Sequence, residues 1–148
     1  MKAKKGKSNH AKARAHGNAW EKRILTYLES LGWTVDRAKM AQKCVGPGIW
    51  VSYSADFFGC LDLIAINAEM PYTLCIQATL GDIKSHKEKL EAVAWHDAAQ
   101  RIQLWTRQDG IISGVRVLML LPGKKKERTW TEHIWKMKDG VQPPQGVL

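Results

Sequence analysis

The sequence predicts an α/β domain in which a central mixed β-sheet is flanked by helices. Two stretches have the periodicity of amphipathic helices, and short apolar runs between and after them have the length of buried strands. The predicted order is helix, strand, strand, strand, helix, strand, strand. At 148 residues the chain is long enough for one domain and too short for two of ordinary size.

The chain is strongly basic, with 23 Lys and Arg residues against 14 Asp and Glu residues and a formal net charge of +9. Contact with a polyanion is favourable because neutralised phosphates release condensed counterions, so nucleic acid is the expected partner. A generally basic, soluble protein is the plainer alternative. The candidate nucleic-acid contacts are Lys4, Lys5, Lys7, Arg14, Arg37, Lys124, Lys125 and Lys126.

Cysteine usage and hydropathy indicate a cytoplasmic protein without a membrane segment. The three cysteines form no C-x-x-C pair, and an odd number cannot close into a complete set of disulfides. The apolar run at residues 117–121 is far shorter than the ~20 residues needed to span a bilayer. The basic N-terminal segment lacks the apolar stretch of a secretory signal.

Composition divides the chain into three parts. Residues 1–16 carry basic side chains and no acid, so we expect a flexible arm that either binds phosphates or is simply solvated. Residues 17–138 form the predicted domain. Residues 139–148, which include Pro143-Pro144, are expected to be an irregular C-terminal tail.

A first helix is predicted over residues 19–31, with Asn18 as its N-cap and Gly32 as its stop. At 100° per residue its apolar side chains span an arc of about 140°, and Glu21 falls inside that arc. A carboxylate on the inner face is either a site residue or the partner of Asn18 in a capping box. The apolar positions are Trp20, Ile24, Leu25, Leu28 and Leu31.

A short strand is predicted over residues 33–37, followed at 38–54 by a long loop or loose hairpin around Gly46-Pro47-Gly48. Two apolar strands then flank a turn at residues 67–72. If that turn is symmetric, Ile66 pairs with Thr73 and Asp62 lies directly opposite Gln77. Opposed side chains share a face at ~5 Å, so one ion could contact both, whereas a slip of one residue would separate them.

A second helix is predicted over residues 85–100, with Ser85 and Glu88 as a capping box. Its expected inner face consists of Leu90, Val93, Ala94 and Ala98. Further strands are predicted at residues 102–106 and 115–121, and residues 131–137 form either an edge strand or a short helix.

The polar residues beside these elements have the chemistry of a magnesium site. Phosphodiester hydrolysis needs an activated water and a counter-charge, and Mg²⁺ or Mn²⁺ can supply both. Suitable oxygen ligands are the Asp62 carboxylate, the Gln77 amide and the backbone carbonyl of Ala78, with Glu21 binding through water or holding a second ion. Asp56 is either an additional ligand, if it shares a continuous strand with Asp62, or a loop cap.

This pattern resembles the PD-(D/E)XK nuclease superfamily and, within it, the archaeal-type Holliday junction resolvases. The resemblance covers about residues 17–105. Gly17-x-x-x-Glu21 matches the first motif, Asp62 the motif aspartate, although Leu61 stands where the motif has proline, and Gln77 the place of the second acid, where Mrr-like restriction nucleases also carry glutamine. The resemblance implies a restriction-endonuclease-like core, Mg²⁺-dependent endodeoxyribonuclease activity on branched DNA, and a homodimer that cuts two strands symmetrically.

The departure from the family pattern is Thr79, which stands where the family carries lysine and cannot supply its positive charge. Some members carry this lysine on the following helix, where this chain has Lys84, Lys87 and Lys89. Lys87 is narrowly favoured because it lies about 60° from Leu90 on the helix, and Lys84 is second because it is closest to the strand ends. Alternatively, all three form a solvated charged run.

Two other functions fit the same sequence. A catalytically degenerate DNA-binding module would retain the basic surface after loss of the lysine and of one acid. A restriction or repair nuclease would use the same residues on linear duplex.

Overall fold

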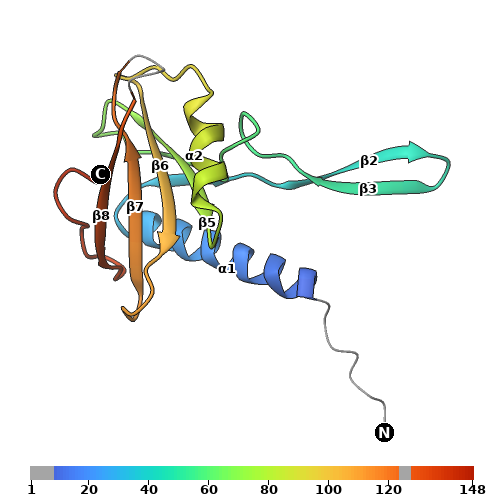
Figure 1. Ribbon diagram of the computed structural model, residues 1–148, viewed down its shortest axis with the longest axis horizontal. Coiled ribbons are helices and arrows are strands. Elements are labelled where there is room, and N and C mark those ends of the chain that lie inside the picture. Colours follow the sequence, from blue (N-terminus) through green and yellow to red (C-terminus); the bar gives the residue numbers. More distant parts are fainter. Residues whose placement is uncertain (1–8, 124–127) are drawn as a thin grey trace, which may run out of the picture.

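The computed structural model describes residues 9–123 and 128–148 as an α/β fold in which helices flank a mixed six-stranded sheet (Figure 1), as the sequence predicts. The sheet has the order β1-β4-β5-β6-β7-β8, and β2 and β3 form a separate two-stranded sheet. The elements are α1 (Asn9–Ser30), β1 (Thr34–Arg37), β2 (Met40–Gly46), β3 (Ile49–Ser54), β4 (Leu63–Ile66), β5 (Thr73–Thr79), α2 (Ile83–Glu91), β6 (Gln100–Arg107), β7 (Gly114–Leu120) and β8 (Trp130–Lys136).

The two helices cover opposite faces of the sheet because successive strand residues point to opposite sides. Buried side chains of α1, including Ile24 and Leu28, pack against one face, where Ile76 and Trp105 lie. Leu90 of α2 packs in a second cluster on the other face. Among the described residues, no helix has the length and apolar character needed to cross a membrane.

The pairing of β4 and β5 has the predicted register. Leu63 lies opposite Ile76 and Ala65 lies opposite Leu74 in an antiparallel ladder. Both strands are largely buried, so a slip of one residue would turn apolar side chains away from the core. β5 then pairs in parallel with β6 after the crossover through α2, which makes the sheet mixed. The segment at 131–137 is an edge strand, β8, paired with β7.

The first helix is longer than predicted. It begins at Asn9 rather than at residue 19, so residues 9–16 of the expected flexible arm are helical and residues 1–8 lie outside the described part. Alanine, lysine and arginine dominate this segment, and all three favour helix. Asn18 is therefore internal to α1, and its assignment as an N-cap with Glu21 is wrong. The predicted stop is correct, because Gly32 at φ 90° follows the last turn.

The second helix is shorter than predicted and begins differently. It ends at Glu91 rather than at residue 100, because the Trp95 indole N–H donates to the carbonyl of Leu90 at 2.7 Å and closes the last turn. Asp82 is the N-cap and accepts from the backbone N–H of Ser85, so the predicted capping box is wrong. The expected inner-face residues Ala94 and Ala98 are exposed beyond the helix.

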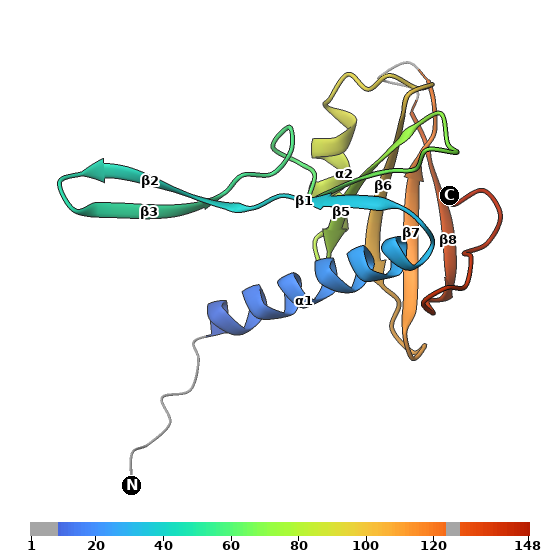
Figure 2. The ribbon, with the colours of Figure 1, turned by 180° about the vertical axis from the view of Figure 1, so that it is seen from behind.

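The segment at 38–54 is a β-hairpin that projects from the domain. Strands β2 and β3 pair with each other, with Lys43 opposite Val51 and Cys44 opposite Trp50. Figures 1 and 2 show this ribbon extending away from the main sheet on the same side as the beginning of α1. The loose-hairpin alternative is therefore the correct one.

The C-terminal segment is irregular, as predicted, but part of it belongs to the core. Val147 is fully buried, and its carbonyl accepts from the side-chain amide of Gln103 at 2.5 Å. Gln103, also fully buried, accepts in turn from the Trp105 indole N–H at 2.9 Å. Tyr27 donates its hydroxyl to the carbonyl of Val141 at 2.8 Å. These contacts tie the tail to α1 and β6.

Deleting Val147 and Leu148 should lower the free energy of unfolding by about 2–4 kcal/mol. The deletion exposes apolar surface and leaves the buried Gln103 amide without its acceptor. Urea denaturation would measure the change, with deletion of Leu148 alone as the matched control. Equal and small effects of the two deletions would show that the tail contact contributes little.

Candidate active site

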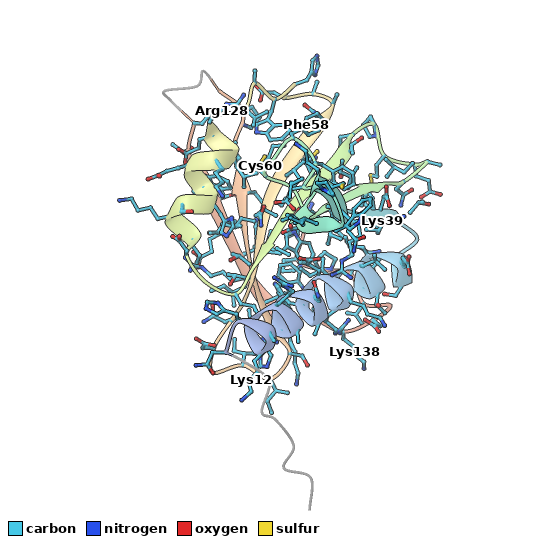
Figure 3. All side chains as sticks on the ribbon, turned by 90° about the vertical axis from the view of Figure 1, so that its right-hand side faces the viewer. Lys12, Lys39, Phe58, Cys60, Arg128 and Lys138 are labelled. Carbon is cyan, nitrogen blue, oxygen red and sulfur yellow. The ribbon has the colours of Figure 1, made fainter. Side chains whose placement is uncertain are left out.

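An open cavity of about 420 Å³ lies where α1, β1, the base of the hairpin and the loop before β4 meet. Three carboxylates and two cations line it, which makes it the most highly charged of the cavities described. Its lining residues are Asn18, Glu21, Arg37, Ala38, Lys39, Asp56 and Asp62. Figure 3 looks along the hairpin toward the core, with Lys39 at the hairpin base.

Asp62 and Gln77 meet as the register predicts. The Gln77 side-chain N–H donates to Asp62 Oδ2 at 2.7 Å, and the backbone N–H of Ala78 donates to the same oxygen at 2.9 Å. The Gln77 nitrogen also donates to the Ala78 carbonyl at 3.2 Å. Both Asp62 and Gln77 are buried, at 9% and 5% exposed. Two of the proposed oxygen ligands therefore converge on the Gln77 amide.

The electrostatic state of Asp62 follows from this burial. The pKa of the Asp62 carboxyl is raised to about 7, mainly by loss of solvent and in smaller part by the negative charges of Glu21 and Asp56. The Ala78 hydrogen bond and the Arg37 guanidinium act in the opposite direction. A buried carboxylate surrounded by like charges is stabilised by any added cation, and such perturbed groups are concentrated at functional sites.

Glu21 faces the cavity through an ion pair with Arg37. Arg37 Nε donates to Glu21 Oε2 at 2.7 Å, and Arg37 Nη2 donates to Asn18 Oδ1 at 3.0 Å. Asn18 and Glu21, which lie one turn apart on α1, thus both bind the guanidinium of Arg37 at the end of β1. The capping interpretation of Glu21 is therefore wrong, and its carboxylate lines the cavity instead. Arg37 is predicted from the sequence only as a DNA contact, whereas in the structure it lines the cavity together with the three carboxylates.

The sequence contains a signal for the position of Arg37 at this site. In the β1–β4 ladder Arg37 pairs with Leu63, the residue after Asp62. Antiparallel pairing of the strand at residues 33–37 with the strand that follows Asp62 would have brought the guanidinium to this edge of the sheet.

Asp56 lines the cavity without sharing a strand with Asp62. β4 begins only at Leu63, and a tight turn with Phe58 at φ 55° precedes it. The turn is closed by the Phe57 N–H, which donates to the Leu61 carbonyl at 2.9 Å. The continuous-strand assumption is therefore wrong, although the turn still directs Asp56 to the same cavity.

Thr79 is engaged locally at the end of β5. Its hydroxyl donates to the Gly81 carbonyl at 2.5 Å and accepts from the Gly81 N–H at 3.1 Å. The side chain thus organises the turn into α2 and supplies no charge where the family carries lysine.

The lysines of α2 are spread over different directions. The Lys87 ammonium lies 5.5 Å from the ring centre of Trp130 on β8, three strands away from β5 in the sheet. Lys84 is exposed in the first turn. Burial is the main cause of the shifted pKa values of Cys60 and His86; the positive charge of Lys89 lowers both values, and the negative charge of Asp56 raises both. The structure thus does not bring the favoured Lys87 to Asp62.

The remaining sequence candidates lie away from the cavity or outside the described part. Arg14 is exposed on α1. The candidates outside the described residues are Lys4, Lys5, Lys7, Lys124, Lys125 and Lys126.

The donor set fits a hard divalent cation in its chemistry. The Asp62 carboxylate and the Ala78 carbonyl both lie within hydrogen-bond distance of the Gln77 side-chain amide, and Glu21 lines the cavity beside Asp62. Coordination by Gln77 oxygen requires its amide to rotate, because the nitrogen now points at Asp62 and Ala78. Within residues 9–123 and 128–148, no three Asp, Glu, His or Cys side chains are grouped closely enough to hold a metal by themselves.

Comparisons with protein-family models, curated proteins and solved structures gave no match.

Asp62→Asn should raise stability at pH 8 by at least about 1 kcal/mol and have a smaller effect at pH 5. The folded-state pKa of about 7 lies above the ordinary aspartate value of 3.8, so ionisation of Asp62 destabilises the fold progressively as pH rises between these two values. The asparagine oxygen can still accept both hydrogen bonds. Urea denaturation in EDTA would measure the effect, with Glu69→Gln as a control for the loss of one exposed negative charge. A destabilised Asp62→Asn protein at pH 8 would contradict the argument.

Proposed function

We propose that the protein is a Mg²⁺- or Mn²⁺-dependent endodeoxyribonuclease with a restriction-endonuclease-like core that acts on branched DNA. The observation that carries the proposal is the contact between Asp62 and Gln77 across β4 and β5, beside a cavity that also contains Glu21. This is the motif arrangement that the resemblance to Holliday junction resolvases implies.

The topology supports the proposed core. One helix precedes three strands, β1, β4 and β5, that pair in antiparallel fashion, and α2 then crosses to the parallel strand β6. The polar ends of β4 and β5 lie at one edge of this unit, where α1 supplies Glu21. A site assembled on strand ends is held more rigidly than one built on loops alone.

Asp62 and the Ala78 carbonyl would hold the metal, together with the Gln77 oxygen after the amide rotates; Glu21 would bind through water. A bound Mg²⁺ supplies an activated water and neutralises charge on the phosphate. The cavity carboxylates repel one another when they are ionised, and this favours occupancy by a divalent cation. Burial of Asp62 strengthens each electrostatic contact at the site.

We propose that Arg37 supplies the positive charge for which the family uses lysine. Its guanidinium lines the cavity and lowers the pKa of Asp62, so it lies within electrostatic range of the reacting region. The ion pair with Glu21 and the hydrogen bond to Asn18 hold it in one orientation. A preorganised guanidinium can stabilise the negative charge that develops on the phosphate in the transition state.

The proposal for branched DNA and a homodimer follows the resolvase resemblance. The net charge of +9 supports binding to a phosphate backbone. Symmetric cleavage of a four-way junction needs two sites related by a twofold axis, which a C2 dimer would present. The second candidate function, a catalytically degenerate DNA-binding module, is favoured by Thr79 and by the neutral Gln77. A nuclease acting on linear duplex is the remaining alternative.

Asp62→Asn should abolish cleavage while leaving DNA binding within a few-fold of wild type, because Asp62 holds the metal and the basic surface provides affinity. Cleavage would be measured with Mg²⁺ or Mn²⁺ on four-way junction, flap, nicked, single-stranded and linear duplex DNA, and binding would be measured in EDTA. The control is Glu69→Ala, which lies in the turn between β4 and β5, at the opposite end of these two strands from Asp62. Unchanged cleavage by folded Asp62→Asn would exclude the assigned site, and a wild-type protein that binds without cutting would support the degenerate module.

Gln77→Glu should lower the Mg²⁺ concentration needed for half-maximal cleavage and increase the thermal stabilisation by Mg²⁺. The substitution places a second carboxylate 2.7 Å from Asp62, where a cation relieves the repulsion. Mg²⁺ titrations of both proteins would measure the change. If the metal requirement is unchanged and Gln77→Ala is fully active, Gln77 is not a ligand.

Arg37→Ala should slow single-turnover cleavage by ~100-fold, because loss of one charge at the transition state costs a few kcal/mol. Arg37→Lys should restore part of the rate. Lys87→Ala is the matched control and should change the rate by no more than a few-fold, since Lys87 lies over Trp130. A larger loss in Lys84→Ala, Lys87→Ala or Lys89→Ala than in Arg37→Ala would assign the charge to α2 instead.

A further inference from the structure

The hairpin at 38–54 exposes an unusual concentration of apolar side chains on a ribbon that has no partner within the described chain. Trp50 is 65% exposed, the largest side chain among them. The others are Val45, Ile49 and Val51. A two-stranded ribbon is marginally stable in water by itself, and grouped exposed apolar residues are typical of a binding surface.

The hairpin is joined directly to the candidate site. The Ala38 N–H donates to the backbone carbonyl of Asp62 at 2.8 Å, and the Ala55 N–H donates to the carbonyl of Lys39 at 3.3 Å. Arg37, Ala38 and Lys39 before the ribbon and Asp56 after it all line the cavity. A molecule seated at the cavity therefore lies at the base of the ribbon (Figure 2).

The charge of the ribbon favours DNA over a second copy of the chain. Residues 38–55 include Lys39 and Lys43 and no acid, so the ribbon adds positive charge to a chain that already carries +9. Two such ribbons would repel each other, whereas a phosphate backbone complements them. In the ladder Lys43 lies one position from the Cys44–Trp50 pair, so its ammonium extends from the face of the ribbon opposite to that of the indole.

We propose that this hairpin engages branched DNA and that Trp50 stacks on a base left unstacked at the branch; the inference rests on the proposed DNA substrate. An indole stacks on any base, and apolar wedges enter base steps that are already open. A linear duplex presents free base faces only at its ends, so stacking by Trp50 would distinguish an internal branch from continuous duplex. At about 3.3 Å per residue, the six residues of β3 span about 20 Å between Trp50 and the cavity. A nuclease site in the cavity would therefore cut within about six nucleotides of the stacked base.

The test compares wild type, Trp50→Ala, Trp50→Phe and the control Ile112→Ala, which alters another exposed apolar residue in the turn between β6 and β7. Fluorescence anisotropy in EDTA would measure binding to a four-way junction and to linear duplex of the same length. 2-Aminopurine at the branch would report stacking directly. Circular dichroism would verify folding, and sedimentation would report the oligomeric state.

Trp50→Ala should weaken junction binding about tenfold or more and abolish the 2-aminopurine quenching, while duplex binding changes less than threefold. Trp50→Phe should keep most of both signals, and Ile112→Ala should match wild type. An equal loss on both DNAs, or no loss, would overturn the proposal. Dissociation of a dimer by Trp50→Ala without a selective loss of junction binding would assign the ribbon to contact between copies and would also overturn it.

These outcomes are separate from those of the proposed nuclease activity because binding is measured without metal. Junction-selective binding through Trp50 in a protein that no metal activates would support the ribbon and reject the nuclease. Metal-dependent cleavage with unchanged binding by Trp50→Ala would support the nuclease and reject the ribbon.

Discussion

The burial of the Asp62 carboxylate is the constraint on which the candidate site depends. Two donors from β5, the Gln77 amide and the Ala78 N–H, meet one oxygen of this side chain. They offset part of the cost of removing a carboxylate from water, but its pKa still rises to about 7. The fold thus maintains an acidic group under electrostatic strain, and such a group gains most when a cation binds. The apolar pattern of β4 and β5 enforces the register that makes this contact, so core packing and site geometry have the same origin.

Around this carboxylate the cavity is assembled from segments that are far apart in the sequence. α1 supplies Glu21, β1 supplies Arg37 and the turn before β4 supplies Asp56. Arg37 links two of these segments, because its guanidinium joins Glu21 and Asn18 while its strand pairs with β4. The guanidinium of Arg37 compensates the nearby carboxylates, and in the proposed function it would supply the positive charge that Thr79 lacks.

The hairpin formed by β2 and β3 is joined directly to this site. Its base bonds to the backbone of Asp62, and its tip presents Trp50 beyond the main sheet. Among the described residues no other strand pairs with this ribbon, which extends away from the main sheet in Figures 1 and 2, so its stability depends on its own ladder and on any partner that binds it. In the proposed function these two parts would have separate roles: the cavity would carry the chemistry, and the hairpin would select among DNA shapes.

The sequence by itself determined the α/β class, the central strands and the Asp62–Gln77 pair, because a symmetric turn at residues 67–72 sets the register of β4 against β5. Local signals failed where long-range contacts override them. Asn18 has the character of a cap, yet α1 continues through it and the side chain binds Arg37. Lys87 has the correct helical angle for the inner face, but angle alone does not say which strand it meets, and that strand is β8. The sequence left Asp56 as either a ligand or a loop cap and gave Arg37 only as a DNA contact, and the tertiary structure decided that both line the cavity. Strand pairing brings Arg37 to Asp62 and a turn brings Asp56 there, whereas spacing along the chain does not.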